Sequence, residues 1–378
     1  MLPRLNLCTD SGLNLSSLCC RSASVFTAPL QLQSDNLKLT LSSKLKAKPS
    51  DETDLKFGHL FTDHMLTVNW RQSEGWSSPR IQPFQNLSLH PACKVFHYAQ
   101  ELYEGMKAYR GVDGRIRLFR PDLNMKRMNM TAERSCLPTF DPDQLLECIK
   151  RSVKLLTIYC STVQYITVQY STVQYRRLLV VESDWVPAAK NSSLYIRPAM
   201  IGTEPTLGLG PANQATLFVI LSPVGAYFGE KIKPVSLLCD PAYVRATPGG
   251  CGYTKMGSNY APTLWVQRRA ETEGCEQVLW VFGEEQEVTE VGAMNIFCLL
   301  RSESGQLELV TPPLTSGTVL PGVTRQSVLE LARRVEGLQV RERRITLPDL
   351  LRASSEGRVL EMFGCGTAAI ISPVGRLK

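Results

Sequence analysis

The chain has 378 residues, of which 43% are hydrophobic and 20% are charged, which is ordinary for a globular protein of about two domains. No segment approaches the roughly 18–20 consecutive apolar residues that a membrane-spanning helix requires. The formal net charge of +7 comes from scattered Lys and Arg residues without a long basic block, so the composition does not favour a nucleic-acid-binding protein.

Cysteine and histidine spacings give no sign of a metal site. None of the cysteines forms a C-x-x-C pair, so zinc-ribbon and thioredoxin-like proteins have no support. The four histidines, His59, His64, His90 and His97, are spaced as H-x4-H and H-x6-H, which matches no strong metal-ligand motif. We therefore expect structural histidines and no bound metal.

Residues 1–50 differ in composition from the rest of the chain. They are rich in Ser, Leu and Thr, and the first thirty carry Arg4 and Arg21 but one acidic residue, Asp10. This composition indicates an organellar transit peptide, with a disordered tail as the alternative. Globular sequence is expected from about Phe57.

A helix is predicted to begin after Asp141. Asp141, Pro142 and Gln144 form a capping pattern with proline at the first helical position. The apolar residues that follow at helical spacing are Leu145, Leu146, Ile149, Val153 and Leu156.

Three nearly identical units follow at 161–165, 166–170 and 171–175, each ending in TVQY. This period is too short for a solenoid repeat. The Val, Thr and Tyr content favours extended chain and aggregation, so we interpret the segment as an insertion, with a binding loop as the alternative.

The remaining pattern indicates mixed strands and helices. Apolar runs at 194–196, 217–221 and 278–282 predict strands. A helix is predicted over about 261–273, ended by Gly274. Another is predicted after Thr324, with an apolar face made by Val328, Leu331, Ala332 and Val335. The expected fold class is therefore α/β or α+β, with 222–225 (SPVG) as a linker between two domains.

Two glycine-containing segments could hold a phosphate group. Gly322, Val323 and Thr324 precede a predicted helix, where free backbone amides and the helix dipole favour an anion. Residues 364–367 (GCGT) form a compact loop that could make an anion nest. Each alone is weak evidence, because glycine before a helix is often only part of a turn, but together they favour a phosphorylated ligand.

Two ionisable residues could act on such a ligand. Lys255 lies among small and apolar residues, where loss of water would favour the neutral amine as a nucleophile or base; a solvated surface lysine is the alternative. Glu290 lies in a mostly neutral stretch and could keep a pyridine nitrogen protonated, or simply form a turn. The residues alone indicate an α/β enzyme with a phosphorylated cofactor.

Eight short segments, taken in their order along the chain, carry a resemblance to a known family. They are FTDHM (61–65), QNLSLHP (85–91), EGMKA (104–108), LNM (123–125), YIRP (195–198), KMGSNY (255–260), TEVG (289–292) and LPGV (320–323). Together they resemble the branched-chain amino acid aminotransferases, which are fold-type IV pyridoxal-phosphate enzymes, over about residues 57–374. Segments 84–87 and 221–228 are most similar to the mitochondrial form, so the resemblance implies a mitochondrial protein, with the cytoplasm as the alternative.

The resemblance implies pyridoxal 5'-phosphate as the cofactor and assigns its contacts. Lys255 would carry it through a Schiff base and move the catalytic proton. Glu290 would pair with the pyridine nitrogen, and Tyr260 would bond the phenolic oxygen. The phosphate would be held by Arg127, Thr367 and the backbone amides of Val323 and Thr324.

The implied reaction transfers the amino group of L-leucine, L-isoleucine or L-valine to 2-oxoglutarate by ping-pong chemistry. The residues that would line the substrate pocket are Tyr98, Tyr103, Tyr195, Arg197, Tyr227 and Ala368. Arg197 would pair with the distal carboxylate of 2-oxoglutarate or glutamate. The partners are then small-molecule substrates and a second copy of the chain in a homodimer.

The resemblance also implies a division of the chain. A small N-terminal domain is expected over 57–222, with the repeat insertion at about 157–183. A linker is expected at 223–234 and a large cofactor domain at 235–378, with the ligand between the domains. The family continues beyond Lys378 with a further strand and helix, so the cofactor domain is expected to be truncated.

Other departures from the family pattern affect single positions. Ala369 and Ser372 occupy the place of a redox-sensitive C-x-x-C, so thiol–disulfide regulation there is expected to be absent. Ala293 replaces a usual Thr and Ser258 a usual Gly, which could lower turnover.

Two alternative functions stay open. One is a catalytically impaired, truncated isoform that acts through dimerisation. The other is a related fold-type IV enzyme, such as a D-amino acid aminotransferase or an aminodeoxychorismate lyase, which EGMK (104–107) and the pocket tyrosines disfavour.

Overall fold

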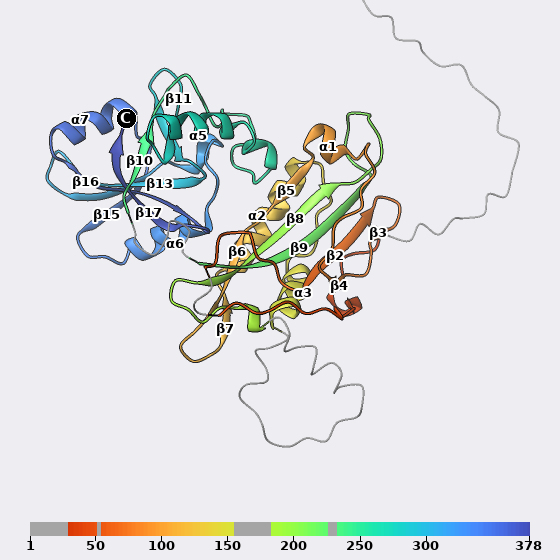
Figure 1. The fold of residues 1–378 in the computed structure, drawn as a ribbon. Helices are drawn as coiled ribbons and strands as arrows, with labels where there is room; N and C mark the ends of the chain where they lie inside the picture. The colour runs from red at the N-terminus through yellow and green to blue at the C-terminus, as the bar shows by residue number, and fades with distance from the viewer. Residues whose placement is uncertain (1–28, 51–53, 155–182, 226–232) are drawn as a thin grey trace, which may run out of the picture.

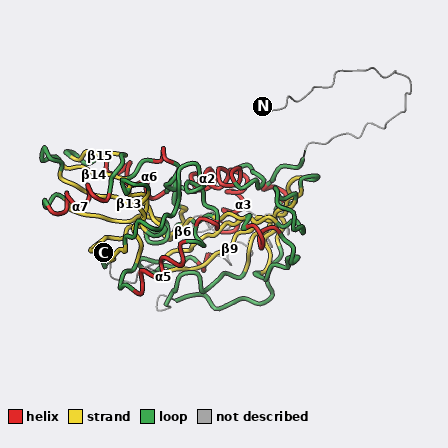
Figure 2. Tube along the Cα trace, turned by 90° about the horizontal axis from the view of Figure 1, so that it is seen from above, coloured by secondary structure: helices red, strands yellow, loops and turns green. Residues whose placement is uncertain are grey.

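The computed structural model describes residues 29–50, 54–154, 183–225 and 233–378. These ranges form two β-sheets with associated helices, which lie side by side in Figure 1 and, from above, in Figure 2. The expected two-domain fold of mixed helices and strands is thus observed. The five-residue repeats lie outside the described residues.

The first sheet has the strand order β1-β4-β2-β9-β8-β6-β7, with β3 beside β2 and β5 beside β8. Its strands are β1 (Lys38–Leu39), β2 (His64–Arg71), β3 (Gly75–Trp76), β4 (Arg80–Pro83), β5 (Glu101–Tyr103), β6 (Met106–Arg110), β7 (Ile116–Leu118), β8 (Ser193–Gly202) and β9 (Gln214–Val224). The accompanying helices are η1 (Ser34–Asn36), α1 (Lys94–Tyr98), α2 (Pro121–Arg134), α3 (Pro142–Lys154) and η2 (Ser183–Trp185).

Helices α2 and α3 cover one face of the first sheet (Figure 2). Because side chains alternate along a strand, every second residue of β9 from Ala215 to Leu221 is buried in the same core. Met125 and Met128 of α2 and Ile149 of α3 fill the core from the helical side.

The second sheet has the order β12-β11-β10-β17-β16-β13-β14-β15. Its strands are β10 (Val235–Leu238), β11 (Gln277–Phe282), β12 (Glu287–Val291), β13 (Met294–Arg301), β14 (Leu307–Thr311), β15 (Leu338–Glu342), β16 (Val359–Gly366) and β17 (Ile370–Leu377). The helices are η3 (Gly257–Asn259), α5 (Thr263–Thr272), η4 (Leu314–Ser316), α6 (Val323–Ala332) and α7 (Leu347–Ser355).

Helices pack on both faces of the second sheet. Along β13, Ile296 and Cys298 share a core with Leu350 of α7, whereas Phe297 points to the other face and packs with Leu329 of α6. The nearly continuous apolar run of this strand follows from its burial on both sides.

Part of the segment expected as a tail is folded. Leu32 is fully buried in the first core, β1 pairs in parallel with β4, and the backbone N–H of Ser34 donates to Gln144 Oε1 at 2.8 Å. Gly75 accommodates this chain, because a Cβ there would lie 2.3 Å from the backbone of Leu30. Residues 29–50 therefore pack against the first sheet, whereas residues 1–28 lie outside the described residues.

We expect Leu32→Ala to destabilise the protein by about 2–5 kcal/mol, because it removes a fully buried side chain from a core. Leu45→Ala is the matched control, since Leu45 is 58% exposed and its truncation should change stability little. Urea unfolding of both variants measures the difference. Equal stability of the two variants would contradict the inclusion of residues 29–50 in the folded unit.

The predicted helices are observed, with one shifted face. In α3, Asp141 Oδ1 accepts from the N–H groups of Asp143 (2.8 Å) and Gln144 (3.3 Å), as the capping pattern predicts. Helix α5 ends before Gly274, whose φ is +73°. For α6 the predicted apolar face is confirmed only in part: Val328 and Ala332 pack in the core. Leu331 is 62% exposed and Val335, beyond the end of the helix, is 55% exposed, because the helix turns its Leu329 side toward β13 and β16.

The expected linker at 222–225 also differs from the structure. Strand β9 continues through Val224 and pairs with β8 up to that residue, and Ser222 and Val224 are buried. Pro223 and Gly225 are typical of loops, which is why a linker was predicted. The strand tolerates the proline because β2 pairs with β9 only as far as Val219, so β9 has a free edge beyond that residue. None of the helices in the described ranges is long and apolar enough to cross a membrane.

Candidate active site

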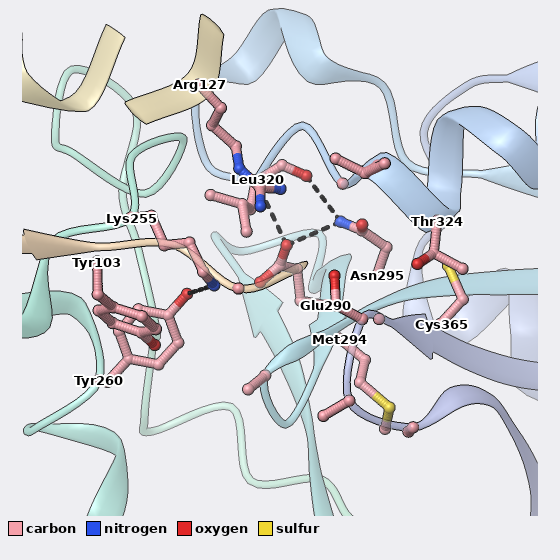
Figure 3. Close-up of a pocket in the computed structure, with 18 of the residues that line it drawn as sticks. Tyr103, Arg127, Lys255, Tyr260, Glu290, Met294, Asn295, Leu320, Thr324 and Cys365 are labelled. Atoms are coloured by element: carbon pink, nitrogen blue, oxygen red, sulfur yellow. Dashed lines mark hydrogen bonds between the residues drawn. The ribbon is translucent and has the colours of Figure 1, made fainter. Parts of the chain in front are cut away.

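A pocket between the two sheets collects most of the residues that the sequence singled out (Figure 3). Those that line it are Tyr103, Arg127, Tyr195, Arg197, Lys255, Tyr260, Glu290, Val323, Thr324, Thr367 and Ala368. They come from α2, β5 and β8 on one side and from β12, α6 and the segments near η3 and β16 on the other. The pocket therefore exists only where the two domains meet.

Lys255 and Tyr260 face each other in this pocket. The short helix η3 reverses the chain between them, so Lys255 Nζ donates to the Tyr260 hydroxyl at 3.0 Å. Burial would raise the pKa of Tyr260, but the charge and hydrogen bond of Lys255 outweigh burial and lower it. The Lys255 backbone is fixed from the other domain: its N–H donates to Thr131 Oγ1 and its carbonyl accepts from Tyr103.

Glu290 lies in the opposite wall, on β12, and is almost fully buried. Its Oε1 accepts from the backbone N–H of Leu320 (2.9 Å) and from Asn295 Nδ2 (3.0 Å), as Figure 3 shows. Burial raises the pKa of this carboxyl, and nearby cations oppose the rise. Fixed donors therefore hold the carboxyl group in place, and Glu290 lines the pocket.

Three elements converge at the other end of the pocket. Arg127 of α2 donates to Glu104 from Nε (2.7 Å) and Nη2 (2.8 Å), and to the carbonyl of Pro321 from Nη1 (3.0 Å). Pro321 immediately precedes Gly322, the N-cap of α6, whose first N–H groups have no partner within the helix. Thr367 lies in the turn between β16 and β17. A guanidinium, a helix N-terminus and a hydroxyl together favour a phosphate.

The remaining wall is aromatic and carries a cation. Tyr195 and Arg197 project from the same face of β8, and Arg197 Nη2 donates to the Tyr195 hydroxyl at 3.1 Å. The Arg197 guanidinium lies 4.7 Å from the ring centre of Tyr103. Its buried Nε has no hydrogen-bond partner within the described ranges. An anionic group could satisfy this nitrogen in a mostly apolar surrounding.

One predicted pocket residue of the described ranges is not brought into this site. Tyr98, at the end of α1, is 39% exposed, and its hydroxyl donates to the carbonyl of Leu207. Tyr227 lies outside the described residues. Of the unusual positions, Ala293 lines the pocket and Ser258 lies in η3.

Sequence reasoning missed several pocket residues. Phe57 packs edge-on against Tyr195 with ring centres 4.8 Å apart, and Gly105 lies so close to the Tyr195 hydroxyl that a Cβ would be 1.9 Å away. Asn295 carried a signal, because it is an amide at the start of a long apolar strand run. Gly105 belongs to the segment 104–108 that carries the resemblance, but nothing local marks it or Phe57 as a neighbour of residue 195.

The side chain of Lys107, on β6 of the first sheet, reaches the turn between β16 and β17 of the second sheet. Its buried Nζ donates to the carbonyl of Ala368, beside Thr367, at 2.8 Å. Burial lowers the pKa of Lys107 to about 8. The folded protein therefore binds fewer protons here than the unfolded chain between about pH 8 and the ordinary lysine value, so this residue makes stability rise with pH across that window.

We expect Lys107→Met to remove this pH dependence. The unfolding free energy of the parent should rise relative to that of the variant as the pH rises from 8 to 10, because only the parent has the amine with the lowered pKa. Chemical unfolding at several pH values tests this, with Lys126→Met, an exposed lysine of α2, as the control. A difference between parent and variant that stays constant with pH would be inconsistent with a titrating Lys107.

Comparisons with known proteins agree with this geometry. A family model described as amino-transferase class IV matches residues 101–377. The mitochondrial branched-chain-amino-acid aminotransferase of Bos taurus is 52% identical over 343 residues, which cover 90% of this chain and 80% of that protein. The cytosolic form of Caenorhabditis elegans is 47% identical over 341 residues, covering 90% and 76%.

Solved structures show the same fold. The branched-chain amino acid aminotransferase of Escherichia coli superposes with a TM-score of 0.60 at 23% identity, covering 82% of this chain and 86% of that one. With both the family model and the relatives covering most of its length, the chain belongs to the branched-chain amino acid aminotransferase family within the class IV aminotransferases.

Proposed function

We propose that this chain transfers the amino group of L-leucine, L-isoleucine or L-valine to 2-oxoglutarate, with pyridoxal 5'-phosphate as its cofactor. The observation that carries the proposal is that Lys255, the buried carboxylate of Glu290 and the groups that favour a phosphate line one pocket with an aromatic wall. The names of the relatives support the substrate class. Because these relatives are half identical over most of the chain, other class IV activities and an impaired isoform are not favoured.

The residues of the pocket fit pyridoxal 5'-phosphate. Arg127, Thr367 and the amides of Val323 and Thr324 would hold its phosphate, Tyr260 its phenolic oxygen, Glu290 its ring nitrogen and Lys255 its aldehyde carbon. The unpaired N–H groups of α6 and the carboxyl group of Glu290, which lines the pocket, are the features that such a ligand satisfies. When bound, this cofactor withdraws electrons from the substrate and so weakens its Cα–H bond.

The side chains of this protein then bind substrate and move one proton. Once the amine of the substrate has displaced it from the aldehyde carbon, Lys255 Nζ is free to take the proton from the substrate Cα, and the Tyr260 hydroxyl holds that amine in place. Tyr103, Tyr195 and Phe57 give an apolar surface for a branched aliphatic side chain. Arg197, with its unsatisfied Nε, binds the distal carboxylate of 2-oxoglutarate in the second half of the cycle.

We also propose that the chain works as a homodimer in the mitochondrion. Tyr98 lies outside the pocket of its own chain, as expected of a residue that completes the pocket of a second copy. The mitochondrial relatives and the composition of residues 1–28 support this location, and the similar cytosolic relatives make the cytoplasm the alternative. We propose a small domain that extends from residue 57 to the end of β9 at Val224 and is joined by residues 29–50, a linker that begins after Val224 rather than at 223, and a cofactor domain of 235–378.

The test is a pair of half-reactions on the full chain purified with pyridoxal 5'-phosphate. L-leucine should bleach the absorption band of the bound cofactor, and 2-oxoglutarate should restore it. D-leucine is the control that separates this function from that of a D-amino acid aminotransferase. A folded chain that shows no cofactor band, or a band that only D-leucine changes, would overturn the proposal.

A further inference from the structure

Arg245 lies behind the pocket and touches three of the segments that build it. The residue belongs to the connection between β10 and η3, and its side chain is 2% exposed. Its Nε lies 2.9 Å from Glu290 Oε2. Its Nη1 donates to the carbonyl of Thr318 (3.0 Å) and its Nη2 to that of Gly252 (3.2 Å). The guanidinium thus contacts the carboxylate, the loop before α6 and the loop before Lys255.

The hydrogen bonds and the ion pair of Glu290 leave one acceptor site of its carboxylate without a donor among the described residues. A carboxylate has about four acceptor sites. Leu320 N–H and Asn295 Nδ2 both donate to Oε1, and Arg245 occupies one side of Oε2. Asn295 is itself anchored, because its Nδ2 also donates to the carbonyl of Leu320 at 2.8 Å. The remaining acceptor site on Oε2 is available to a donor in the pocket that Glu290 lines.

Charge decides whether Glu290 can accept a proton donor. Burial raises the pKa of Glu290, and the cations that oppose this are Arg245, Lys255 and Arg127. The other titratable groups that face it are Tyr260 and Cys365. Of the cations, Arg245 is in ion-pair contact and is itself buried, so its attraction is weakly screened. Without this cation, the carboxyl could lower its free energy by taking up a proton.

We propose that Arg245 is a positioning residue for catalysis, which holds Glu290 as a carboxylate and aims its free acceptor site at the ring nitrogen of the cofactor. The inference rests on the proposed function, since the ring nitrogen belongs to pyridoxal 5'-phosphate. An ionised Glu290 stabilises a protonated ring nitrogen, which is the form that withdraws electrons strongly. A neutral Glu290 would donate a hydrogen bond to an unprotonated nitrogen instead.

The test compares the binding of pyridoxal 5'-phosphate with that of its 1-deaza analogue, in which carbon replaces the ring nitrogen. Equilibrium dialysis gives the Kd of each compound for the unaltered chain and for Arg245→Gln, Arg245→Lys and Arg245→Gln/Glu290→Gln. The unaltered chain should prefer the nitrogen compound by roughly ten- to hundredfold, the range expected for a charge-assisted hydrogen bond. The preference should fall to about severalfold, the level of a neutral hydrogen bond, in Arg245→Gln and in the double variant, and should largely persist in Arg245→Lys.

A purely structural role for Arg245 predicts a different pattern. Arg245→Gln would then lose stability and bind both compounds less well, with an unchanged preference, and that result overturns the inference. If Arg245→Gln does not fold, Arg245→Lys still decides, because it keeps the positive charge beside Glu290: the preference should persist in it, and a folded Arg245→Lys without the preference overturns the inference.

Turnover of L-leucine, measured on the same unaltered chain, separates this inference from the proposed function. A chain that turns over leucine but binds both compounds equally retains the function and overturns the role of Arg245. A chain that binds neither compound overturns both.

Discussion

Replacement of Lys255 by alanine is expected to lower kcat for L-leucine by about ten-thousandfold or more, because it removes both the covalent attachment point and the base at the substrate Cα. Binding of pyridoxal 5'-phosphate should weaken far less, because its phosphate and ring contacts involve other residues. The protein should stay folded, since Lys255 makes its structural bonds through its backbone, to Thr131 and Tyr103.

Controls make the measurement specific. Tyr260→Phe keeps the amine and loses only its 3.0 Å partner, so its kcat should fall less than that of Lys255→Ala. Lys126→Ala, on the exposed side of α2, should leave kcat unchanged. Added methylamine should restore part of the activity of Lys255→Ala, because a small amine can enter the vacated space. Activity of Lys255→Ala within tenfold of the parent would rule out Lys255 as the catalytic amine.

Sequence patterns predicted this site only in fragments. The glycine at 322 and the loop at 364–367 were each weak as anion sites. Their significance comes from convergence with Arg127, which contacts the carbonyl of Pro321 across 194 positions of sequence. No local pattern encodes such a contact, and the resemblance to a family was needed to join the fragments. Arg245 had no sequence signal at all, because a single arginine in a loop is usually a surface residue.

The fold was predictable where local chemistry decides. The cap at Asp141 and the glycine at 274 set helix ends through backbone bonds and a positive φ, which a sequence displays directly. The face of α6 was predictable only in part: Val328 and Ala332 pack in the core as predicted, but the burial of Leu329 depends on strands that are distant in sequence. Residues 29–50 were likewise misjudged, since Leu32 depends on a core whose other members lie between Leu66 and Leu221.

Replacement of Glu104 by glutamine is expected to cost about 3–5 kcal/mol of unfolding free energy at neutral pH. Glu104 is fully buried and meets Arg127 through two hydrogen bonds, so the change leaves a buried guanidinium without its counter-charge. Asp113→Asn is the matched control, since it breaks a similar two-bond pair with Arg117 at an exposed site, where the loss should be much smaller. Equal losses in the two variants would contradict the importance of burial.

The pH dependence of this loss has a definite sign. Burial alone would raise the pKa of Glu104, but the charge and hydrogen bonds of Arg127 outweigh burial and lower it below its ordinary value of 4.5. A depressed carboxyl pKa contributes stability that is fully present above the ordinary value and is lost as the pH falls through the folded value. The gap between the parent and Glu104→Gln should therefore be constant near neutrality and narrow below about pH 4.5. Chemical unfolding between pH 3.5 and 7 measures it.

The cofactor should partly rescue Glu104→Gln, which links the stability of the fold to the site. Arg127 lines the pocket, and its guanidinium loses an anion when Glu104 becomes neutral. A bound phosphate would supply another anion to the same group, so pyridoxal 5'-phosphate should raise the Tm of Glu104→Gln more than that of the parent at equal concentration. In the Arg127→Met variant, which has no guanidinium at this place, the cofactor should raise the Tm no more than it does in the parent. If the cofactor raised the Tm of all three proteins equally, Arg127 would not be a phosphate ligand, and Glu104 and Arg127 would form a structural pair alone.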